Sequence, residues 1–282
     1  MSWLLFTLVG LILGSFSTIL RRLLMQDDKN DALASVVVFQ FMGFGIVLIF
    51  ALLNGSGVPD ITVHPVNYLA QAILWGTASY CIFKATKYLE AAEVSIIATL
   101  SSIVTIITAV VFLHEIFTLP RIIGTVLIIA AVIMVSYKTQ KFKLNKGVWY
   151  ALMYCLVSGV AITNDTFLLK STGVFSLLTV GWLTPGIFLL IVQPRVIKKL
   201  GYILNWSRLK KLFTMTLVYA LGGISFYYAI AVGGQASQVN TISQSGIILT
   251  TLLGALFLNE RDSLGKKFVS AFIVVLGVFL LS

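Results

Sequence analysis

Charged residues, histidine and cysteine are all scarce in this sequence of 282 residues. Only 11% of the residues are charged, 59% are hydrophobic, and the mean hydropathy is +1.00, which excludes an ordinary soluble domain. The two cysteines, Cys81 and Cys155, both lie in apolar segments, so they can form neither a disulfide framework nor a metal-binding spacing. With only two histidines as well, the sequence predicts no metal site and no cofactor.

The net charge of +10 does not predict a nucleic-acid partner. The basic residues form short clusters between apolar runs and no compact basic face, and in a membrane protein such clusters report orientation. The expected partners are therefore the lipid bilayer and a small-molecule substrate, with no nucleic acid, and the sequence is compatible with a monomer.

Long apolar runs dominate the chain. A helix needs about 20 apolar residues to cross the hydrocarbon layer of a bilayer, and the backbone of such runs in lipid must be helical to satisfy its own hydrogen bonds. The sequence therefore predicts an all-α membrane protein with about ten transmembrane helices. These segments are Ser2–Leu20, Ala32–Leu53, Val66–Ala85, Ser95–Leu113, Ile122–Ser136, Gly147–Leu168, Phe175–Val192, Leu212–Val232, Val239–Leu258 and Phe268–Leu281.

Lysine and arginine alternate between the gaps that separate these ten segments. Of the 20 basic residues, only Arg121 and Lys170 fall in the even-numbered gaps, 17 fall in the odd-numbered ones, and Lys84 is the last but one residue of the third segment, beside the odd-numbered gap that follows it. Because cytoplasmic loops carry an excess of Lys and Arg, the odd gaps are expected in the cytoplasm. This predicts a multi-pass protein of the plasma or inner cell membrane with both termini outside the cytoplasm.

The two halves of the sequence are related by a displacement of 145 residues without a gap. Gly14 then matches Gly159, Thr18 matches Thr163, and the agreement is best between the ends of the two halves, at 86–137 and 231–282. The expected organisation is a first repeat at 1–137, a basic linker at 138–146 and a second repeat at 147–282. Since each repeat holds five helices, the second should be inverted relative to the first, as in many transporters whose ligand site lies between the halves.

Two corresponding segments resemble the paired units of a known transporter superfamily. They are AAEVSIIATLSSIVTIITAVVFLHE, at 91–115, and ASQVNTISQSGIILTTLLGALFLNE, at 236–260. Each has a helix rich in small and polar residues that ends in Leu-x-Glu, and both are similar to the drug/metabolite transporter superfamily in its ten-helix EamA-type branch. The resemblance implies a basket-like helical carrier with a central cavity that opens alternately to two faces, often exports amino acids or other small metabolites, and is not an enzyme.

Polar side chains follow one face of the two helices that carry this resemblance. Ser95, Thr99 and Ser102 are spaced as one helical stripe, and the other helix repeats the pattern with polar residues of its own. Because unpaired polar groups are unfavourable in lipid, both stripes are expected to face inward as opposite walls of a substrate cavity. Close helix packing is the alternative interpretation. The second stripe consists of Asn240, Ser243 and Gln244.

Aromatic residues and one acidic pair are further candidates for binding substrate. Trp75 and Tyr80 belong to the third segment, and a corresponding region of the eighth carries aromatic residues as well; such rings could stack on a solute or simply pack. An acidic residue inside a membrane segment is a functional candidate, although Lys170 could be a mere ion-pair partner. These candidates are Trp75, Tyr80, Tyr227, Tyr228, Asn164 and Asp165.

Pro185 interrupts the backbone hydrogen bonding of the seventh segment. It is a candidate hinge for alternating access, and a static bend is the alternative. The sequence does not separate the two.

The sequence thus predicts a secondary transporter for a small neutral or zwitterionic metabolite, such as an amino acid, with export as the expected direction. The alternatives are an intramembrane enzyme acting on a lipid-linked substrate and a passive channel. Few catalytic groups are available for the first, since the only histidines are His64 and His114, and no charged ring or filter-like repeat indicates the second.

Overall fold

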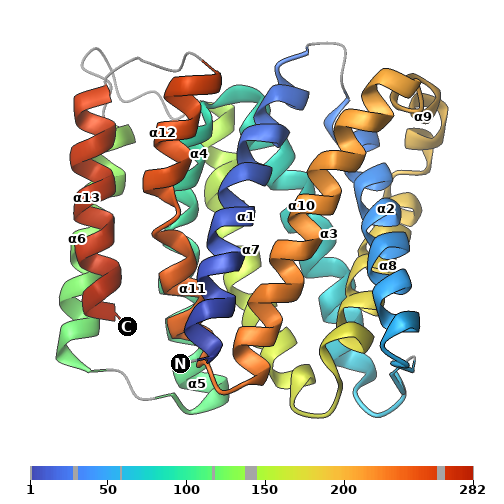
Figure 1. Ribbon diagram of the computed structural model, residues 1–282, viewed down its shortest axis with the longest axis horizontal. Coiled ribbons are helices and arrows are strands. Elements are labelled where there is room, and N and C mark those ends of the chain that lie inside the picture. The colour runs from blue at the N-terminus through green and yellow to red at the C-terminus, as the bar shows by residue number, and fades with distance from the viewer. Residues whose placement is uncertain are drawn as a thin grey trace.

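The computed structural model describes residues 2–27, 31–57, 59–115, 118–136, 145–258 and 264–281, and this part of the chain contains helices and no strand. Figure 1 shows the long helices side by side, running between two ends of the molecule. They are α1 (Ser2–Met25), α2 (Ala32–Leu53), α3 (Pro65–Tyr88), α4 (Ala91–Ala98), α5 (Leu100–Leu113), α6 (Leu119–Ser136), α7 (Lys146–Leu169), α8 (Val174–Val192), the 3-10 helix η1 (Pro194–Val196), α9 (Ile197–Ile203), α10 (Trp206–Ala231), α11 (Ala236–Gln244), α12 (Ile247–Phe257) and α13 (Leu264–Leu281).

In the described part of the chain, seven helical segments are long and apolar enough to cross a membrane. Large apolar side chains also cover the outer surface, such as Leu53, which is 80% exposed, and Phe279, which is 78% exposed. Water would disfavour so much exposed apolar surface, whereas lipid would not. The structure is therefore that of a multi-pass helical membrane protein. The seven segments are Trp3–Met25, Ala32–Leu53, Ala91–Leu113, Lys146–Leu169, Val174–Val192, Trp206–Ala231 and Ala236–Phe257.

Short polar side chains begin several of the helices. The carboxylate of Asp31 accepts hydrogen bonds from the backbone N–H groups of Leu33 and Ala34 at the start of α2, and it pairs with Lys199 of α9 at 2.6 Å. Desolvation raises the pKa of Asp31, but the hydrogen bonds from Lys199 and from the two backbone groups outweigh it and lower the pKa overall. This contact ties α9 to the beginning of α2.

Two of the expected segments are broken helices. The first divides into α4 and α5 at Thr99, and the second divides into α11 and α12 at Ser245 and Gly246. At each break a hydroxyl bonds to the carbonyl oxygen three residues earlier: Thr99 to Ile96, and Ser245 to Ile242. The expected segments Ser95–Leu113 and Val239–Leu258 therefore each consist of two consecutive helices, and the two breaks correspond between the halves to within one residue.

The first helix is longer than expected. Hydropathy ended it at Leu20, but α1 continues to Met25 and carries Arg21 into the interior, where this residue is only 7% exposed. The placement of Arg21 in a loop is thus wrong, because a hydropathy window ends a helix at its first charges whether or not the backbone continues.

Helices of the two halves pack against each other in matched pairs. Helix α1 packs on α10, and α3 packs on α7, which are the same pair after a displacement of 145 residues. The pairs α2 with α8 and α6 with α13 match themselves, and Figure 1 shows α6 and α13 together at one edge of the molecule. At the crossing of α1 and α10, a Cβ added to Gly10 would lie 3.2 Å from the carbonyl oxygen of Gly222. Glycine at this point allows the two backbones to approach closely.

Candidate functional site

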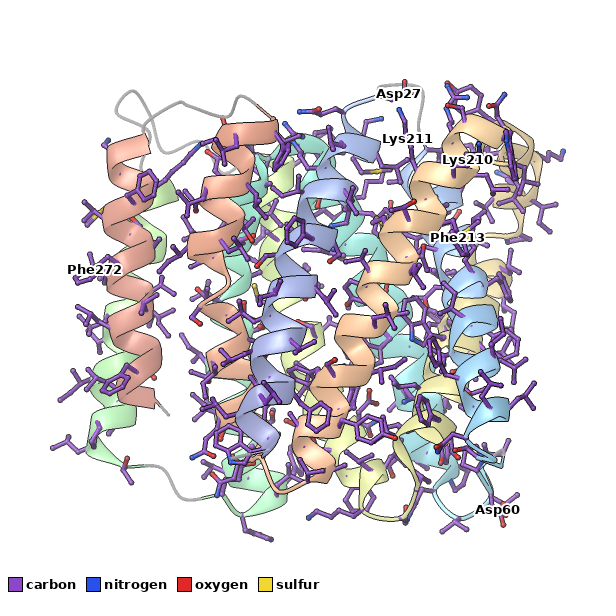
Figure 2. All side chains as sticks on the ribbon, viewed as in Figure 1. Asp27, Asp60, Lys210, Lys211, Phe213 and Phe272 are labelled. Atoms are coloured by element: carbon purple, nitrogen blue, oxygen red, sulfur yellow. The ribbon has the colours of Figure 1, made fainter. Side chains whose placement is uncertain are left out.

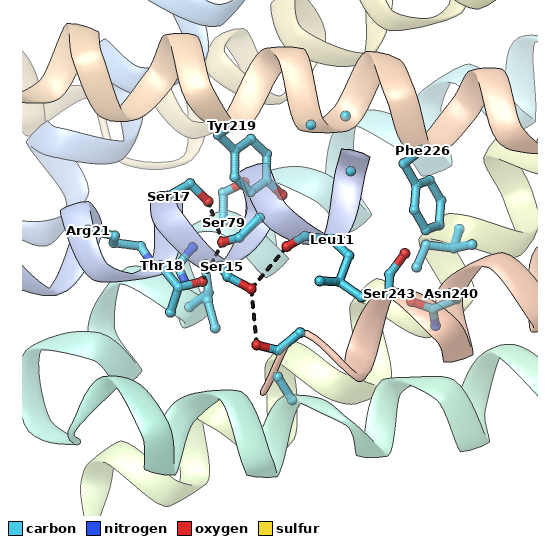
Figure 3. A pocket seen from close by; sticks show the side chains of 18 of the residues that line it. Leu11, Ser15, Ser17, Thr18, Arg21, Ser79, Tyr219, Phe226, Asn240 and Ser243 are labelled. Carbon is cyan, nitrogen blue, oxygen red and sulfur yellow. Dashed lines mark hydrogen bonds between the residues drawn. The ribbon is translucent and has the colours of Figure 1, made fainter. Parts of the chain in front are cut away.

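A cavity of about 250 Å³ lies among helices of both halves. Ser15 and Arg21 of α1 and Trp75 of α3 contribute to it from the first half, and Tyr227 of α10 and Asn240 of α11 contribute from the second. Figure 3 shows hydroxyl, amide and aromatic side chains converging on this space from several helices. Its size suits a small metabolite.

Asp165 of α7 lies at the wall of this cavity and is 2% exposed. Its carboxylate accepts hydrogen bonds from Gln71 at 2.9 Å, from the indole N–H of Trp75 at 2.7 Å and from the phenol of Tyr227 at 2.5 Å. These three donors are all neutral. Lys170, which the sequence offered as a possible ion-pair partner, lies exposed at the end of α7. The carboxylate therefore joins α7 to α3 and α10 and brings a negative charge to the cavity wall.

Asn164, the neighbour of Asp165, makes a reciprocal contact with α3. It accepts a hydrogen bond from the side chain of Asn67 at 2.8 Å and donates one to the carbonyl oxygen of Asn67 at 3.0 Å. Asn67 thus engages both the oxygen and the nitrogen of the Asn164 side-chain amide. Asn164 is not among the residues that line the cavity.

The polar stripe of α11 faces the cavity and also contacts α5. Asn240 and Gln244 line the cavity together with Ser243, and they donate to Thr105 at 3.0 Å and to Ser101 at 3.2 Å respectively. These two hydrogen bonds join α11 of the second half to α5 of the first half.

Of the polar stripe in the first half, only one residue lines the cavity. Ser95 lines the cavity, whereas Thr99 and Ser102 are fully buried and lie outside the lining. Thr99 donates to the carbonyl oxygen of Ile96 at the helix break. The structure thus brings Ser95 together with the α11 stripe and leaves the other two in the packing between helices. Their part in binding stays a prediction.

Two of the four aromatic candidates line the cavity, and the other two do not. Trp75 and Tyr227 line the cavity and share Asp165 as their hydrogen-bond acceptor. Tyr80 instead packs edge-on against Tyr150, with ring centroids 6.0 Å apart, and Tyr228 stacks on Phe6 at 5.7 Å. These last two rings pack helix against helix outside the lining.

Pro185 lies buried within α8, which continues on both sides of it from Val174 to Val192. A Cβ added to Gly76 of α3 would lie 3.3 Å from the carbonyl oxygen of Pro185, so the two helices pack closely here. The role of Pro185 as a hinge stays a prediction.

Several lining residues were not among the sequence candidates, and Arg21 is the most important. It donates from Nε to the hydroxyl of Thr86 at 3.1 Å and from Nη2 to the hydroxyl of Thr18 at 3.4 Å. Two phenols, those of Tyr154 and Tyr219, line the cavity beside it. The helical spacing of Gly14, Thr18 and Arg21 was the available signal, since it places all three on one face of α1.

Hydrogen bonds also join the other lining residues that sequence reasoning missed. Ser15 donates to the carbonyl oxygen of Gly246 at 3.0 Å, which ties α1 to the break between α11 and α12. Gln40 of α2 donates to Ser79 of α3 at 2.8 Å. Within the described residues, no group of three or more His, Cys, Asp or Glu side chains is placed to hold a metal ion.

The sequence also matches the model of a known protein family. The model of the EamA-like transporter family matches residues 1–137 and again residues 145–282. The chain belongs to the EamA-like transporter family. The match confirms the resemblance to EamA-type transporters that the sequence shows. Members of this family are membrane transporters of small molecules and not enzymes.

The fold of this EamA-like protein also occurs among solved structures. One, described as "Crystal structure of protein", matches it with a TM-score of 0.71 and 15% sequence identity, over 98% of this chain and 95% of the other. At this identity the likeness shows the fold alone. No curated protein matches the sequence.

Proposed function

We propose that this EamA-like protein is a secondary transporter that carries a small neutral or zwitterionic metabolite, such as an amino acid, through its central cavity by alternating access. The observation that carries the proposal is the composition of the cavity wall. Hydroxyls, amides and aromatic rings from both halves surround the space, and the charged lining residues in the described chain are Arg21 and Asp165, one of each sign. A solute without net charge suits such a wall, because burying an unpaired net charge is unfavourable.

Alternating access in this protein rests on ten membrane-spanning segments arranged as two inverted five-helix halves. The matched pairs α1 with α10 and α3 with α7 support this arrangement, because a twofold relation between halves produces such pairs. In Figure 1, α1 starts and α13 finishes toward the same end of the molecule, as an even number of crossings requires.

The cytoplasmic side of the cell membrane is the end that carries the basic residues. Figure 2 shows Lys210 and Lys211 at one end of the molecule and Asp60 at the other. The excess of Lys and Arg in cytoplasmic loops supports this orientation, with both termini outside. Export is the proposed direction of transport.

Flux measured with the purified protein in liposomes tests the proposal. Amino acids and other small neutral metabolites, each radiolabelled, are offered outside liposomes that contain the same unlabelled compound. A carrier gives uptake that saturates and that the unlabelled compound inside accelerates. Uptake that rises linearly and ignores the internal compound would indicate a passive channel, and the absence of flux for every compound would favour the intramembrane enzyme.

A further inference from the structure

Arg21 is a permanently charged side chain in a buried position. Its guanidinium does not lose its proton in proteins, and it carries five N–H donors in a planar fork. The contacts with Thr86 and Thr18 engage two of these donors. Within the described chain the other three donors have no partner, although the residue is only 7% exposed and lines the cavity.

No carboxylate of the described chain balances this charge. The ion pairs found there take their acidic partners from Asp27, Asp31 and Glu90, none of which contacts Arg21. The hydrogen bonds of Arg21 go to neutral hydroxyls, and Tyr154 and Tyr219, two lining residues that interact with its charge, are neutral phenols.

Asp165, the other charged lining residue, lies too far away to be the partner. Helices α1 and α10 cross at Gly10 and Gly222 and run in opposite directions (Figure 1). From that crossing Arg21 lies 11 residues along α1, and Tyr227, which binds Asp165, lies five residues the other way along α10. At 1.5 Å per residue their Cα atoms are roughly 24 Å apart along the helices. Figure 3 accordingly shows Arg21 and Phe226 at opposite sides of the pocket.

A buried charge without a counter-ion is unfavourable by several kcal/mol, and the open donors of this one face a cavity that admits a solute. We infer that Arg21 is the carboxylate-binding subsite of this cavity, so that the transported metabolite carries a carboxylate group. The inference rests on the proposed function and narrows its substrate class. The guanidinium fork matches the two oxygens of a carboxylate, and the phenols of Tyr154 and Tyr219 supply further neutral donors at this end.

A monocarboxylate fits this subsite better than a phosphate does. Within the described lining, Arg21 is the one cation, whereas a phosphate near neutral pH carries close to two negative charges. One guanidinium balances the single charge of one carboxylate group. In a zwitterion this carboxylate belongs to a solute that has no net charge.

Paired ligands that differ only in this group test the inference. Binding to the purified full-length protein is measured for leucine, phenylalanine and threonine, each beside its own carboxamide, and for inorganic phosphate. Hydrogen bonds to charged groups contribute about 1.5–3 kcal/mol, so the parent should prefer acid over amide by about 10- to 150-fold. Arg21→Gln should bring this ratio close to one, and Arg21→Lys, which keeps the charge, should retain most of it.

Arg22→Gln is the matched control. Arg22 donates to the carbonyl oxygens of Thr86 and Lys87 and lies outside the lining, so its loss should leave the ratio of acid to amide unchanged even if stability falls. A purely structural Arg21 would lower the affinities for acid and amide together.

An unchanged ratio in Arg21→Gln overturns the inference, as does a parent that binds none of the acids or that binds phosphate more tightly than every acid. Saturable, exchange-stimulated flux of the amides alone would also overturn it while leaving the proposed transport intact. If the parent moves no compound at all, the proposed function itself fails.

Discussion

The carboxylate of Asp165 is both a cavity group and a structural one. Its oxygens accept from three neutral donors on α3 and α10. Asp165→Asn replaces one oxygen by an NH2 group, which faces the donors and leaves at least one of them unpaired. An unpaired buried donor typically costs about 1–3 kcal/mol, so we expect a lower melting temperature together with loss of flux.

Melting of the detergent-solubilised protein measures this effect. Tyr227→Phe, which removes one donor and keeps the charge, is the milder comparison and should lose about 1 kcal/mol. If Asp165→Asn melts like the parent, the carboxylate does not hold these helices together.

Gln244 offers its amide to the cavity and to Ser101. Losing one hydrogen bond to a bound solute typically costs ~0.5–1.5 kcal/mol, so Gln244→Ala should weaken apparent affinity about three- to tenfold per folded molecule. Asn240→Ala should do the same and also lower stability, because Asn240 is only 3% exposed and bonds to Thr105.

Thr108→Val is the control for these two substitutions. The hydroxyl of Thr108 contacts that of Thr163 at 2.6 Å, a link between α5 and α7 that lies outside the lining. Transport that falls only in proportion to stability in all three variants would mean that the α11 stripe is a packing seam.

Single residues were predictable from the sequence where their chemistry conflicts with lipid. An acidic side chain in an apolar run identified Asp165, and amides in another run identified Asn240 and Gln244. Hydropathy did not identify Arg21 as a cavity residue, because Arg21 directly follows an apolar run of full membrane length. Its burial depends on Thr86, Tyr154 and Tyr219, which are distant in sequence and become neighbours only through helix packing.

At the scale of helices, glycine sets how closely α5 and α7 approach. A Cβ added to Gly159 of α7 would lie 2.5 Å from the Cβ of Val104 and 2.9 Å from the backbone oxygen of Ser101. Gly159→Ala should therefore force the helices apart and lower the free energy of unfolding by about 1–3 kcal/mol. Unfolding monitored by circular dichroism measures the change.

Gly45→Ala is the matched control on α2, because an added Cβ there meets no atom within 4 Å. It should be neutral or stabilise the helix by up to about 1 kcal/mol. Equal stabilities of the two variants would contradict the close packing of α5 on α7.

Hydropathy predicts where helices exist, and the ten expected segments all fall on one helix or on two consecutive ones. It does not predict the breaks at Thr99 and Ser245. Neither break has a proline, and both use a hydroxyl that bonds to a carbonyl oxygen three residues back. The same hydroxyls are common in unbroken membrane helices, so the sequence alone does not distinguish the two cases.

At the scale of the whole molecule, the proposed orientation can be measured in intact cells. Cys81 and Cys155 are buried and can be replaced by alanine to give a background free of cysteine. In that background a cysteine at Asp60 should react with a membrane-impermeant thiol reagent added outside, and a cysteine at Lys210 should react only after permeabilisation. The opposite pattern would invert the orientation and leave the fold unchanged.

The repeat of 145 residues carried most of the information about the whole molecule. It related α1 to α7 and α3 to α10, and the structure packs α1 on α10 and α3 on α7, two pairs that this relation exchanges. It did not locate the cavity in detail, because Ser95 reaches the lining while Thr99 and Ser102 on the same stripe do not. The break at Thr99 and the neighbouring helices decide which face of the stripe meets open space.

The central claim is that the cavity between the halves is the path of the solute, and a blocked cavity tests it most directly. Gly14 lines the cavity, and a Cβ added there meets no atom within 4 Å. In the cysteine-free background, Gly14→Cys protein in liposomes should lose its flux when a bulky thiol reagent modifies it, and excess substrate should slow that modification. Gly45→Cys, on α2 and outside the lining, should keep its flux after the same treatment. Fully modified Gly14→Cys protein that transports at its unmodified rate would contradict the account.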